Sequence, residues 1–535
     1  MPLPLLPHLL PKIHFSPRYL YASGGWHDIA GAITHNGVHH IYQGEGWNHA
    51  TSTDLVHWFT APHGPQTIHE TYKGMDSQSS PCSGFITKDP DDHNRICAGF
   101  RQCSSKKGVE GMPHPWDVPL ELRCALDDQL TSWSTDPEYL FNVSFWRPVP
   151  YDPARPWRES DGMWYQLLSL DACNKTDTHG RQHCDAGGQL GMWKSPYLRG
   201  PKANWKIVGP VFSSNKTVLA GGYLVKEFVT IDYIGMLEGD PAPAKDGVSG
   251  TRIFLNNVGG NGGGNGCCSG TTSYFPVVQD SPGGSFRQVA PQGMVDWGAF
   301  TFNASATAPG LTGVDLLIGT ASRGLSMART LGSETSDQVT KPGRRVLIGW
   351  TGPSDYLVHV VSHVDGSAQS LPRDLSLAPD KSLLQRFVPE LQILRRRFQT
   401  GKRATVAGLQ AEVFVTFPST CVGNDRGGNP CGLHLDSYGK LLLDQTKRLV
   451  TLDLMAANNS LVRAGPLPPP TIHGGIEVHL YIDHQIIELL VNNATSIVAY
   501  WSPPAELNSS LELSIAGDGS LNVWELATAN NNTKH

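Results

Sequence analysis

The protein has 535 residues, of which 17% are charged and 39% are hydrophobic, and its formal net charge is −6. This length allows two or more domains with sizeable cores, and the sequence has no basic stripe or tail of the kind that nucleic-acid-binding proteins use. It also has no run of roughly 18 or more apolar residues, so no transmembrane helix and no membrane partner are predicted.

Short apolar runs separated by Gly, Pro, Asn and Asp extend from residue 10 to about residue 370. Clear examples are residues 163–170, 251–258 and 344–350. Long amphipathic helical patterns are missing from this part of the sequence. Many short strands with frequent turns predict a sandwich, a barrel or a propeller. Because the stretch is long for one sandwich, we assign residues 10–375 to a propeller.

The pattern changes near residue 380. Residues 383–398 have helix-like spacing and a basic end, which predicts a short helix within a linker, residues 376–404. The apolar runs that follow alternate as sandwich strands do, so residues 405–528 are predicted to form a second all-β domain. The Gly-rich insert at residues 259–270 is low in complexity and is predicted to be a mobile loop.

Two features favour a protein that folds in the secretory pathway. The ten cysteines include two close pairs flanked by turn residues, Cys173 with Cys184 and Cys421 with Cys431, which suit loop-closing disulfides. Zinc ligation is the competing interpretation, but no Cys-X-X-Cys occurs. Acceptor motifs for N-glycosylation stand at Asn142, Asn174, Asn215, Asn303, Asn458, Asn493, Asn508 and Asn531. We therefore expect a secreted glycoprotein, extracellular or vacuolar. The proline-rich first residues are unlike a signal peptide, so a mature or truncated chain is expected.

Three segments place an acidic residue among aromatic residues and turn formers. They are GGWHDIAG (24–31) with Asp28, YDPARPW (151–157) with Asp152, and GMLEGDPAP (235–243) with Glu238 and Asp240. Cleavage of a glycosidic bond needs one carboxylate that attacks or stabilises the anomeric carbon and one acid that protonates the leaving oxygen. A third carboxylate can bind sugar hydroxyls. Since most acidic residues lie in solvated turns, each segment alone is a weak signal.

Taken together and in order, these segments resemble glycoside hydrolase family 32, which comprises invertases, fructan hydrolases and fructosyltransferases. HFSP (14–17) and WHDIAG (26–31) resemble the family's opening HF-X-P and WMNDPNG boxes, and YDPARPWRESDGMW (151–164) resembles its FRDP box with the following DG-X-W. GMLEGD (235–240) loosely resembles the WECPD box. Further similar segments are 41–58, 82–84, 295–300, 344–350, 371–377, 383–395 and 481–493.

The resemblance implies an all-β protein, a five-bladed β-propeller followed by a C-terminal β-sandwich. It implies a retaining β-fructofuranosidase with Asp28 as nucleophile, Asp152 as the residue that stabilises the transition state, and Glu238 as acid/base. Glu227 is the rival acid/base under a different alignment. In a retaining enzyme the nucleophile and acid/base carboxyl groups lie roughly 5–5.5 Å apart. No metal and no organic cofactor are implied.

The expected substrate-binding residues follow from the same boxes. They are Trp26, His27, Gln43, Trp47, Ser83, Tyr151 and Asp240. Two of them depart from the family pattern, because His27 replaces an Asn beside the nucleophile and Tyr151 replaces the Arg of the RDP box. Asp54, His57 and Trp164 are interpreted as turn, packing and core residues. Asp483 and Glu488 in the sandwich are interpreted as members of structural salt links.

Several alternatives stay open at this level. The implied partner is sucrose, a fructo-oligosaccharide or a fructan, and the sequence does not choose among them. A fructosyltransferase that uses a sugar acceptor is one alternative function, and a catalytically inactive relative that binds fructosides is another. A propeller hydrolase acting on arabinose polymers would not explain the sandwich motif. The chain is expected to be a monomer or a homodimer.

Overall fold

A computed structural model provides the structure of the chain, and it describes 23 segments of the sequence. These are residues 11–15, 29–43, 47–61, 79–104, 120–134, 138–141, 153–171, 175–176, 182–183, 188–213, 218–219, 223–224, 228–237, 250–258, 272–298, 300–303, 315–318, 326–332, 343–351, 368–421, 431–455, 460–501 and 510–529. Within them nearly every element is a β-strand, as predicted.

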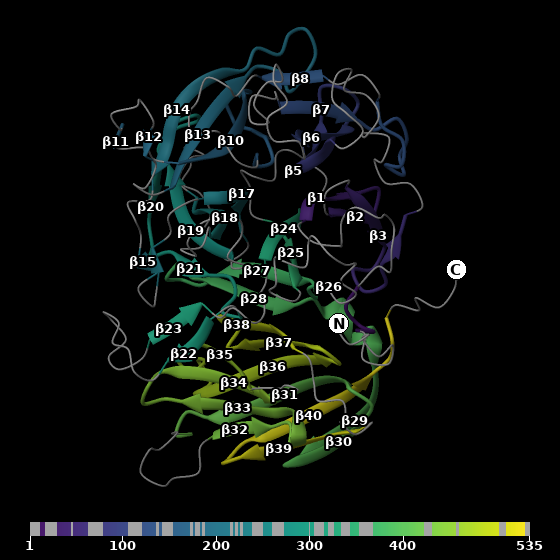
Figure 1. The fold of residues 1–535 in the computed structure, drawn as a ribbon, viewed down its shortest axis with the longest axis vertical. Helices are drawn as coiled ribbons and strands as arrows, with labels where there is room; N and C mark the ends of the chain where they lie inside the picture. Colours follow the sequence, from purple (N-terminus) through teal and green to yellow (C-terminus); the bar gives the residue numbers. More distant parts are fainter. Residues whose placement is uncertain are drawn as a thin grey trace.

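Five antiparallel sheets form the larger part of the molecule, in the upper part of Figure 1. The first sheet contains β1 (Ile29–His35), β2 (Val38–Gln43), β3 (Asn48–Ser52) and β4 (Phe59–Thr60). The second contains β5 (Ser79–Asp89), β6 (Arg95–Ser104), β7 (Leu120–Cys124) and β8 (Glu138–Phe141). The third contains β9 (Trp157–Arg158), β10 (Trp164–Asp171), β13 (Gly188–Ser195) and β14 (Lys206–Ser213).

The remaining propeller sheets follow in chain order. The fourth contains β17 (Phe228–Met236), β18 (Arg252–Val258), β19 (Thr272–Gln279), β20 (Phe286–Gln288) and β21 (Gly293–Met294). The fifth contains β24 (Ser326–Gly332), β25 (Arg345–Thr351), β26 (Ala368–Gln369), β27 (Arg373–Leu377) and β28 (Leu383–Phe387). Short hairpins pair β11 (Lys175–Thr176) with β12 (Gln182–His183), β15 (Val218–Leu219) with β16 (Tyr223–Leu224), and β22 (Phe300–Asn303) with β23 (Asp315–Ile318). The five sheets are the blades of the predicted five-bladed propeller.

Two six-stranded sheets pack face to face below the propeller (Figure 1). One contains, in spatial order, β29 (Arg395–Gly401), β40 (Ser520–Leu526), β31 (Gln410–Pro418), β36 (Gly475–Asp483), β37 (Ile486–Val491) and β38 (Thr495–Tyr500). The other contains β30 (Arg403–Ala407), β39 (Ser510–Ala516), β32 (Cys431–His434), β33 (Gly439–Asp444), β34 (Leu449–Met455) and β35 (Ser460–Pro466). This is the predicted C-terminal sandwich.

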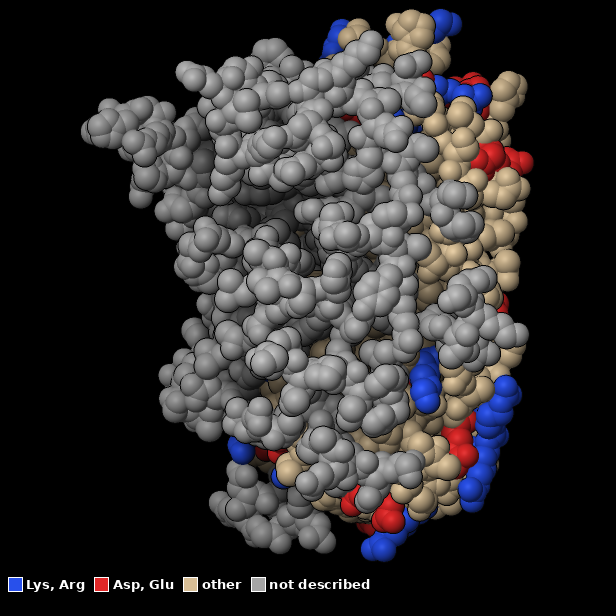
Figure 2. Space-filling view, turned by 45° about the vertical axis from the view of Figure 1, so that its right-hand side comes forward, with Lys and Arg blue, Asp and Glu red and all other residues tan. Residues whose placement is uncertain are grey.

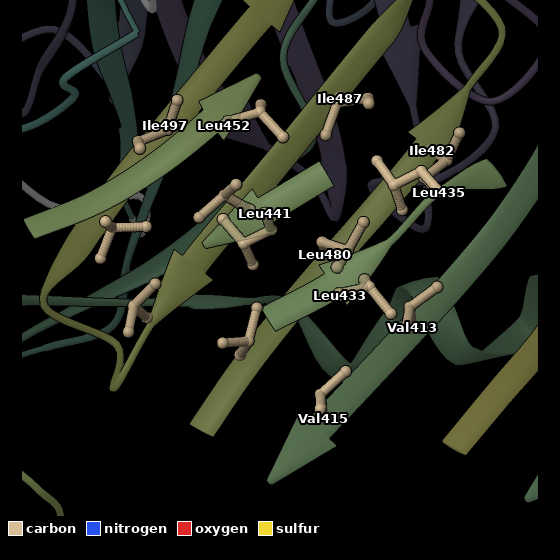
Figure 3. Packing of buried hydrophobic residues seen from close by; sticks show 14 of the residues in the cluster. Val413, Val415, Leu433, Leu435, Leu441, Leu452, Leu480, Ile482, Ile487 and Ile497 are labelled. Atoms are coloured by element: carbon tan, nitrogen blue, oxygen red, sulfur yellow. The ribbon is translucent and has the colours of Figure 1, made fainter. Parts of the chain in front are cut away.

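Alternation along the strands creates the core of the sandwich. In β31 the side chains of Val413 and Val415 are fully buried, whereas the intervening Phe414 and the following Thr416 are half-buried on the other face. Figure 3 shows Val413 and Val415 together with Leu480 of β36 and, from the facing sheet, Leu433 and Leu441. Burial of these side chains is the main force that holds the two sheets together.

The predicted linker differs from the structure over most of its length. Residues 376–404 contain β28, which belongs to the fifth blade, and β29, which belongs to the sandwich. The predicted helix is reduced to one 3₁₀ turn, η5 (Pro389–Leu394), whose buried side chains are Leu391 and Leu394. The helical interpretation of residues 383–398 is therefore wrong for the flanking segments, because pairing with neighbouring strands overrides the local spacing of apolar residues.

A polar cluster of four residues is buried between the propeller and the sandwich, and we call it the seam cluster: His14, Arg373, Asp483 and Glu488. Both ring nitrogens of His14 lie 2.9 Å from an acid, Nδ1 from Asp483 and Nε2 from Glu488. Arg373 of the fifth blade donates to Glu488, and Asp483 also accepts the backbone N–H groups of residues 12–14. All four side chains are fully buried.

Two disulfides lie within the described part of the chain. Cys421–Cys431 joins the ends of residues 422–430 and confirms one predicted pair. Cys97–Cys124 joins the neighbouring strands β6 and β7 and was not predicted, because its partners are far apart in the sequence. The other predicted pair, Cys173 with Cys184, falls outside the described residues.

The surface carries charges of both signs side by side. In Figure 2 the described part of the visible face is mostly uncharged, and Lys and Arg residues lie beside Asp and Glu residues near its upper and lower ends. No helix among the described residues is long and apolar enough to span a membrane.

Candidate active site

Most of the predicted site residues fall outside the part of the chain that the structure describes. They are Trp26, His27, Asp28, Tyr151, Asp152, Glu227, Glu238 and Asp240. Ser83 lies in β5, where only the backbone is described, next to the irregularity in pairing between Pro81 and Gly84. Gln43 and Trp47 are described in full. The site is therefore built from the strands that begin or end at these positions.

The described part of the first blade starts at Ile29, which follows Asp28 in the sequence. Its inner strand β1 starts at Ile29, which pairs with Gln43 at the end of β2. At the other end of the hairpin His35 pairs with Val38, and the turn between them is Asn36–Gly37. Both turn residues have positive φ, 49° and 75°, which is the conformation that a two-residue Asn-Gly hairpin requires. Ile29 and the Asn36–Gly37 turn therefore lie on opposite rims of the propeller.

The third blade begins directly after Asp152. Pro153 forms an isolated bridge with Leu168 of β10, and Trp157 of β9 pairs with Tyr165 of the same strand. The segment from residue 153 to residue 158 is thus an irregular inner strand along β10. It is held by Gln166, whose side-chain amide donates to the Ala154 carbonyl oxygen and, at 3.2 Å, to that of Leu167.

In the fourth blade, Glu227 and Glu238 stand in the sequence on either side of one described segment, Phe228 to Leu237. Its inner strand β17 starts at Phe228, directly after Glu227, and pairs there with Val258. At its other end Met236 pairs with Arg252. Leu237 follows and is buried, and Glu238 comes after it in the sequence. The rim at which each end lies decides which glutamate is near Asp28 and Asp152.

Contacts between the first three blades identify one rim. His35, at the end of β1, lies 3.8 Å from Asp128 of the second blade. Asp89, at the end of β5, accepts a hydrogen bond of 2.9 Å from Arg199 of the third blade. Arg199 follows the end of β13, where Ser195 pairs with Trp164 at the start of β10. These contacts bring the ends of β1 and β5 and the start of β10 to the same rim.

Contacts to the fourth and fifth blades continue along this rim. Arg252, the partner of Met236, donates to Glu159, which follows β9 in the third blade. Both side chains are buried, with 2% of each exposed. Leu237 forms a parallel bridge with Gly343, which lies just before the start of β25. We call this rim, with His35, Asp89, Glu159 and Met236, the latched rim. Ile29, Pro153 and Phe228 lie at the opposite rim.

Arg155 connects two of these inner strands. Its Nη2 donates to the Ala32 carbonyl oxygen of β1 at 2.5 Å, although the first and third blades are not neighbours in chain order. Arg155 lies two residues beyond Pro153, and Ala32 lies three residues beyond Ile29. The contact therefore joins the two inner strands at similar heights below the opposite rim. Neither Arg155 nor Gln166 was singled out from the sequence, because only the strand pairing gives them this role.

Gln43 lies at the opposite rim and is fully buried. Neither its side-chain oxygen nor its nitrogen has a hydrogen-bond partner. Leaving a buried polar group unpaired costs about 1–3 kcal/mol, and natural proteins tolerate this cost mainly at functional sites. Because Gln43 also lies at the rim of Ile29 and Pro153, it is a candidate for contact with a ligand.

Trp47 has a different environment. Its side chain is fully buried in a hydrophobic cluster, 5.8 Å from the ring of Tyr42 and 5.4 Å from the ring of Phe100. The indole thus fills the space between the first two blades and offers no exposed face to a sugar. The prediction that Trp47 lines the substrate pocket is not supported. Trp164 is also fully buried, as predicted for a core residue.

Two buried histidines lie next to Gln43 in the first blade. Nδ1 of His40 is 2.9 Å from Nε2 of His49, and the ring of His49 stacks on Tyr42 at 4.3 Å. Nε2 of His40 is buried without a partner. Burial, together with the nearby His35 and His39, lowers the pKa of His40 to about 4. His40 is therefore neutral in the folded protein across the physiological pH range.

Two other sequence interpretations are confirmed. Asp54 accepts hydrogen bonds from the backbone N–H groups of Val56 and His57 and lies 2.7 Å from Nδ1 of His57, so it forms a turn. Asp483 and Glu488 form the structural salt links of the seam cluster. Among the described residues no group of three or more His, Cys, Asp or Glu side chains is arranged to hold a metal ion.

Comparison with known proteins supports the fold. No family model and no curated protein matches the sequence. Among solved structures, exo-inulinase from Aspergillus awamori matches with a TM-score of 0.67 and 16% identity, covering 97% of this chain and 98% of its own. Fructan 1-exohydrolase IIa from Cichorium intybus matches with a TM-score of 0.67 and 16% identity, covering 98% of each chain. A GH32 β-fructofuranosidase from Bombyx mori, solved with sucrose, matches with a TM-score of 0.63 and 13% identity, covering 98% of this chain and 95% of its own.

Proposed function

We propose that this chain, which has the fold of glycoside hydrolase family 32 enzymes, is a retaining β-fructofuranosidase. One observation carries the proposal. Asp28 and Asp152 directly precede Ile29 and Pro153, the first described residues of two inner strands, and both of these residues lie at the same rim. A third acidic residue, Glu227, directly precedes Phe228 at that rim. A glycosidase site needs such convergence of carboxylates from separate strands.

In the proposed reaction Asp28 attacks C2 of the terminal fructosyl unit. The bond between C2 and the bridging oxygen breaks, that oxygen takes a proton from the acid/base glutamate, and an ester forms between C2 and Asp28. Water then attacks C2, gives its proton to the same glutamate, and releases fructose and the free carboxylate. Asp152 binds the fructose hydroxyls as positive charge develops on the ring. Either Glu227 or Glu238 is the acid/base residue, and they lie on either side of β17.

Three further features support a fructoside ligand. The unpaired amide of Gln43 lies at the rim of Ile29 and Pro153 and would gain partners from sugar hydroxyls. The Bombyx mori relative was solved with sucrose, and the Aspergillus awamori relative is an exo-inulinase. Sucrose, fructo-oligosaccharides and fructans are therefore the proposed substrates. His27 and Tyr151 are proposed to take part in binding in place of the Asn and Arg of the family boxes.

A secreted location, extracellular or vacuolar, is part of the proposal. Two disulfides, Cys97–Cys124 and Cys421–Cys431, support it, since such bonds persist in oxidising compartments. The eight glycosylation motifs point in the same direction. The oligomeric state is proposed to be a monomer or a homodimer.

The test is incubation of the purified protein with sucrose, inulin and levan, followed by chromatography of the sugars. Release of free fructose is the expected result. Products longer than the substrate would identify a fructosyltransferase. Absence of both, with fructose binding in a calorimeter, would identify an inactive binding relative and would overturn the proposed activity.

The nucleophile is tested by the variant Asp28→Asn. Turnover is expected to fall by several orders of magnitude, because an amide is a poor nucleophile at C2. The unfolding curve should match that of the wild-type protein, which excludes a defect in folding. Activity near the wild-type level would rule out Asp28 as the nucleophile.

A further inference from the structure

The direction of β17 separates the two candidate acid/base residues. Phe228 and Met236 are eight residues apart along an extended strand, and each step advances about 3.3 Å. The two ends of β17 are therefore about 26 Å apart. Glu227 precedes one end and Glu238 follows the other, so only one of them can be near the carboxylates of Asp28 and Asp152.

Contacts at the latched rim identify the end of β17 that lies there. Arg252 pairs with Met236 in the fourth blade and donates to the buried Glu159 of the third blade. Glu159 lies six residues beyond Pro153 along the inner segment of that blade. The Met236 end of β17 therefore lies beside the far end of the 153–158 segment, and the Phe228 end lies beside its start, which adjoins Asp152.

The surroundings of Leu237 support the same direction. Leu237 bridges Gly343 and is packed in a buried cluster with Leu347 of the fifth blade and Val498 of the sandwich. Gly343 lies two residues before Arg345, which pairs with Gly332 at the end of β24, so this bridge places Leu237 at the latched rim. Glu238 follows Leu237 in the sequence, at the end of β17 that is remote from Phe228. Since a retaining pair of carboxyl groups is roughly 5–5.5 Å apart, this position does not suit protonation of a bond that Asp28 attacks.

The inner strands of the three blades run in the same direction. Ile29, Pro153 and Phe228 lie at one rim, and the residues that precede them in the sequence are Asp28, Asp152 and Glu227. We infer that Glu227, and not Glu238, is the acid/base residue of the proposed fructofuranosidase. Glu227 donates a proton to the bridging oxygen as C2 bonds to Asp28, and in the second half-reaction its carboxylate takes a proton from the attacking water. The inference rests on the proposed function.

The experiment compares Glu227→Ala, Glu238→Ala and an exposed control, Glu512→Ala on β39 of the sandwich. With sucrose as substrate, Glu227→Ala is expected to lose about 10²–10⁴-fold in kcat. Glu238→Ala and Glu512→Ala are expected to stay within twofold of the wild-type protein. Urea unfolding of each variant separates a loss of chemistry from a loss of fold.

Two further readouts belong to an acid/base residue and not to a structural one. The limb of the wild-type pH profile that falls at alkaline pH should disappear in Glu227→Ala, because the group that titrates there is absent. Sodium azide should divert the second half-reaction of Glu227→Ala from free fructose to β-fructosyl azide, since azide attacks the fructosyl ester without needing a general base. Glu227→Gln, which is closer in shape, repeats the comparison if the alanine variant fails to fold.

The outcomes are distinct. If the wild-type protein releases fructose and Glu227→Ala keeps a kcat within twofold of it, the inference is overturned and the proposed function stays in place. The same holds if Glu238→Ala is inactive and Glu227→Ala is active. A wild-type protein that releases no fructose and forms no transfer product would overturn both.

Discussion

Polar side chains are buried in two regions of this molecule, and the two regions differ in how well those side chains are paired. In the seam cluster both ring nitrogens of His14 face an acid, and Glu488 is shared between His14, Arg373 and a backbone N–H. In the first blade, both polar atoms of the Gln43 amide, at the rim of the candidate active site, have no partner, and neither has one nitrogen of His40, which lies nearer the latched rim. Buried polar groups stabilise a fold when all are satisfied and destabilise it when they are not. In the seam, His14 and both acids are fully paired and only Nε of Arg373 has no partner, whereas both polar atoms of the Gln43 amide are unpaired at the rim where a ligand is proposed to bind.

The largest expected effect comes from removing a charge at the seam. Glu488→Gln should lower the free energy of unfolding by about 3–5 kcal/mol, because it leaves Arg373 and protonated His14 buried with one fewer counter-charge. Urea unfolding measures the change. The matched control is Glu390→Gln, which removes the acid from the more exposed pair with Arg344 and should cost no more than about 1 kcal/mol. Equal losses in the two variants would contradict the importance of the seam.

The contribution of His14 to the stability of the seam is expected to depend on pH. Burial alone would lower its pKa, but the hydrogen bonds that the protonated ring donates to Asp483 and Glu488 reverse this and raise the pKa to about 9, from an ordinary value of 6.5. The pKa values of both acids are lowered despite their burial, so they stay ionised over this range. A raised pKa means that the stabilisation is complete below pH 6.5 and is lost as the pH rises through 9.

The shift corresponds to about 3 kcal/mol. The difference in unfolding free energy between the wild-type protein and His14→Gln should therefore shrink by that amount between pH 6 and pH 10. A constant difference would show that His14 is not protonated in the folded protein.

For His40, the dependence of the unfolding free energy on pH is expected to have the opposite sign. Its pKa is lowered to about 4 by burial and by nearby histidines, so the unfolded chain takes up a proton below pH 6.5 that the folded chain does not. This stabilisation is present above pH 6.5 and is lost as the pH falls toward 4, with a slope of about 1.4 kcal/mol per pH unit. His40→Asn should reduce the acid loss between pH 6 and pH 4.5 by about 2 kcal/mol. The check is the slope of the unfolding free energy against pH, and an unchanged slope would contradict the prediction.

The smallest effect on stability is expected at Gln43. Gln43→Leu should change the free energy of unfolding by no more than about 1 kcal/mol, with a gain as the expected sign, because an unpaired buried amide is removed. The same variant should lose more than about tenfold in kcat/KM for sucrose, since a sugar hydroxyl loses its partner.

Gln385→Leu is the matched control for Gln43→Leu. Gln385 is also buried, but its amide accepts from Arg373 at 3.0 Å and donates to the Val295 carbonyl oxygen at 2.6 Å. The control should lose about 1–3 kcal/mol of stability and little activity. A loss of stability in Gln43→Leu as large as that in Gln385→Leu would remove the distinction between the two regions.

Much of the fold was predictable because local patterns in the sequence indicate the strands and turns. Alternation such as that of β31 and the many turn residues predict short strands, and the ordered motifs predict a propeller followed by a sandwich. The segment 383–398 was mispredicted because its helix-like spacing is a local signal, whereas strand pairing in the fifth blade and the sandwich depends on distant residues. The disulfide Cys97–Cys124 was missed for the same reason.

The candidate site was predictable only in part. The sequence by itself determined that Asp28 and Asp152 stand in boxes suited to a glycosidase, and it left Glu227 and Glu238 as rivals. The inference that favours Glu227 comes only from the tertiary structure, because the rim reached by each end of β17 depends on contacts such as Arg252 with Glu159, between residues 93 positions apart in the sequence. The contacts of the seam cluster also depend on the tertiary structure, since His14 and Asp483 are separated by 469 positions and meet only in the folded protein. Local sequence patterns determine which strands form, but the positions at which their ends meet depend on packing across the whole chain.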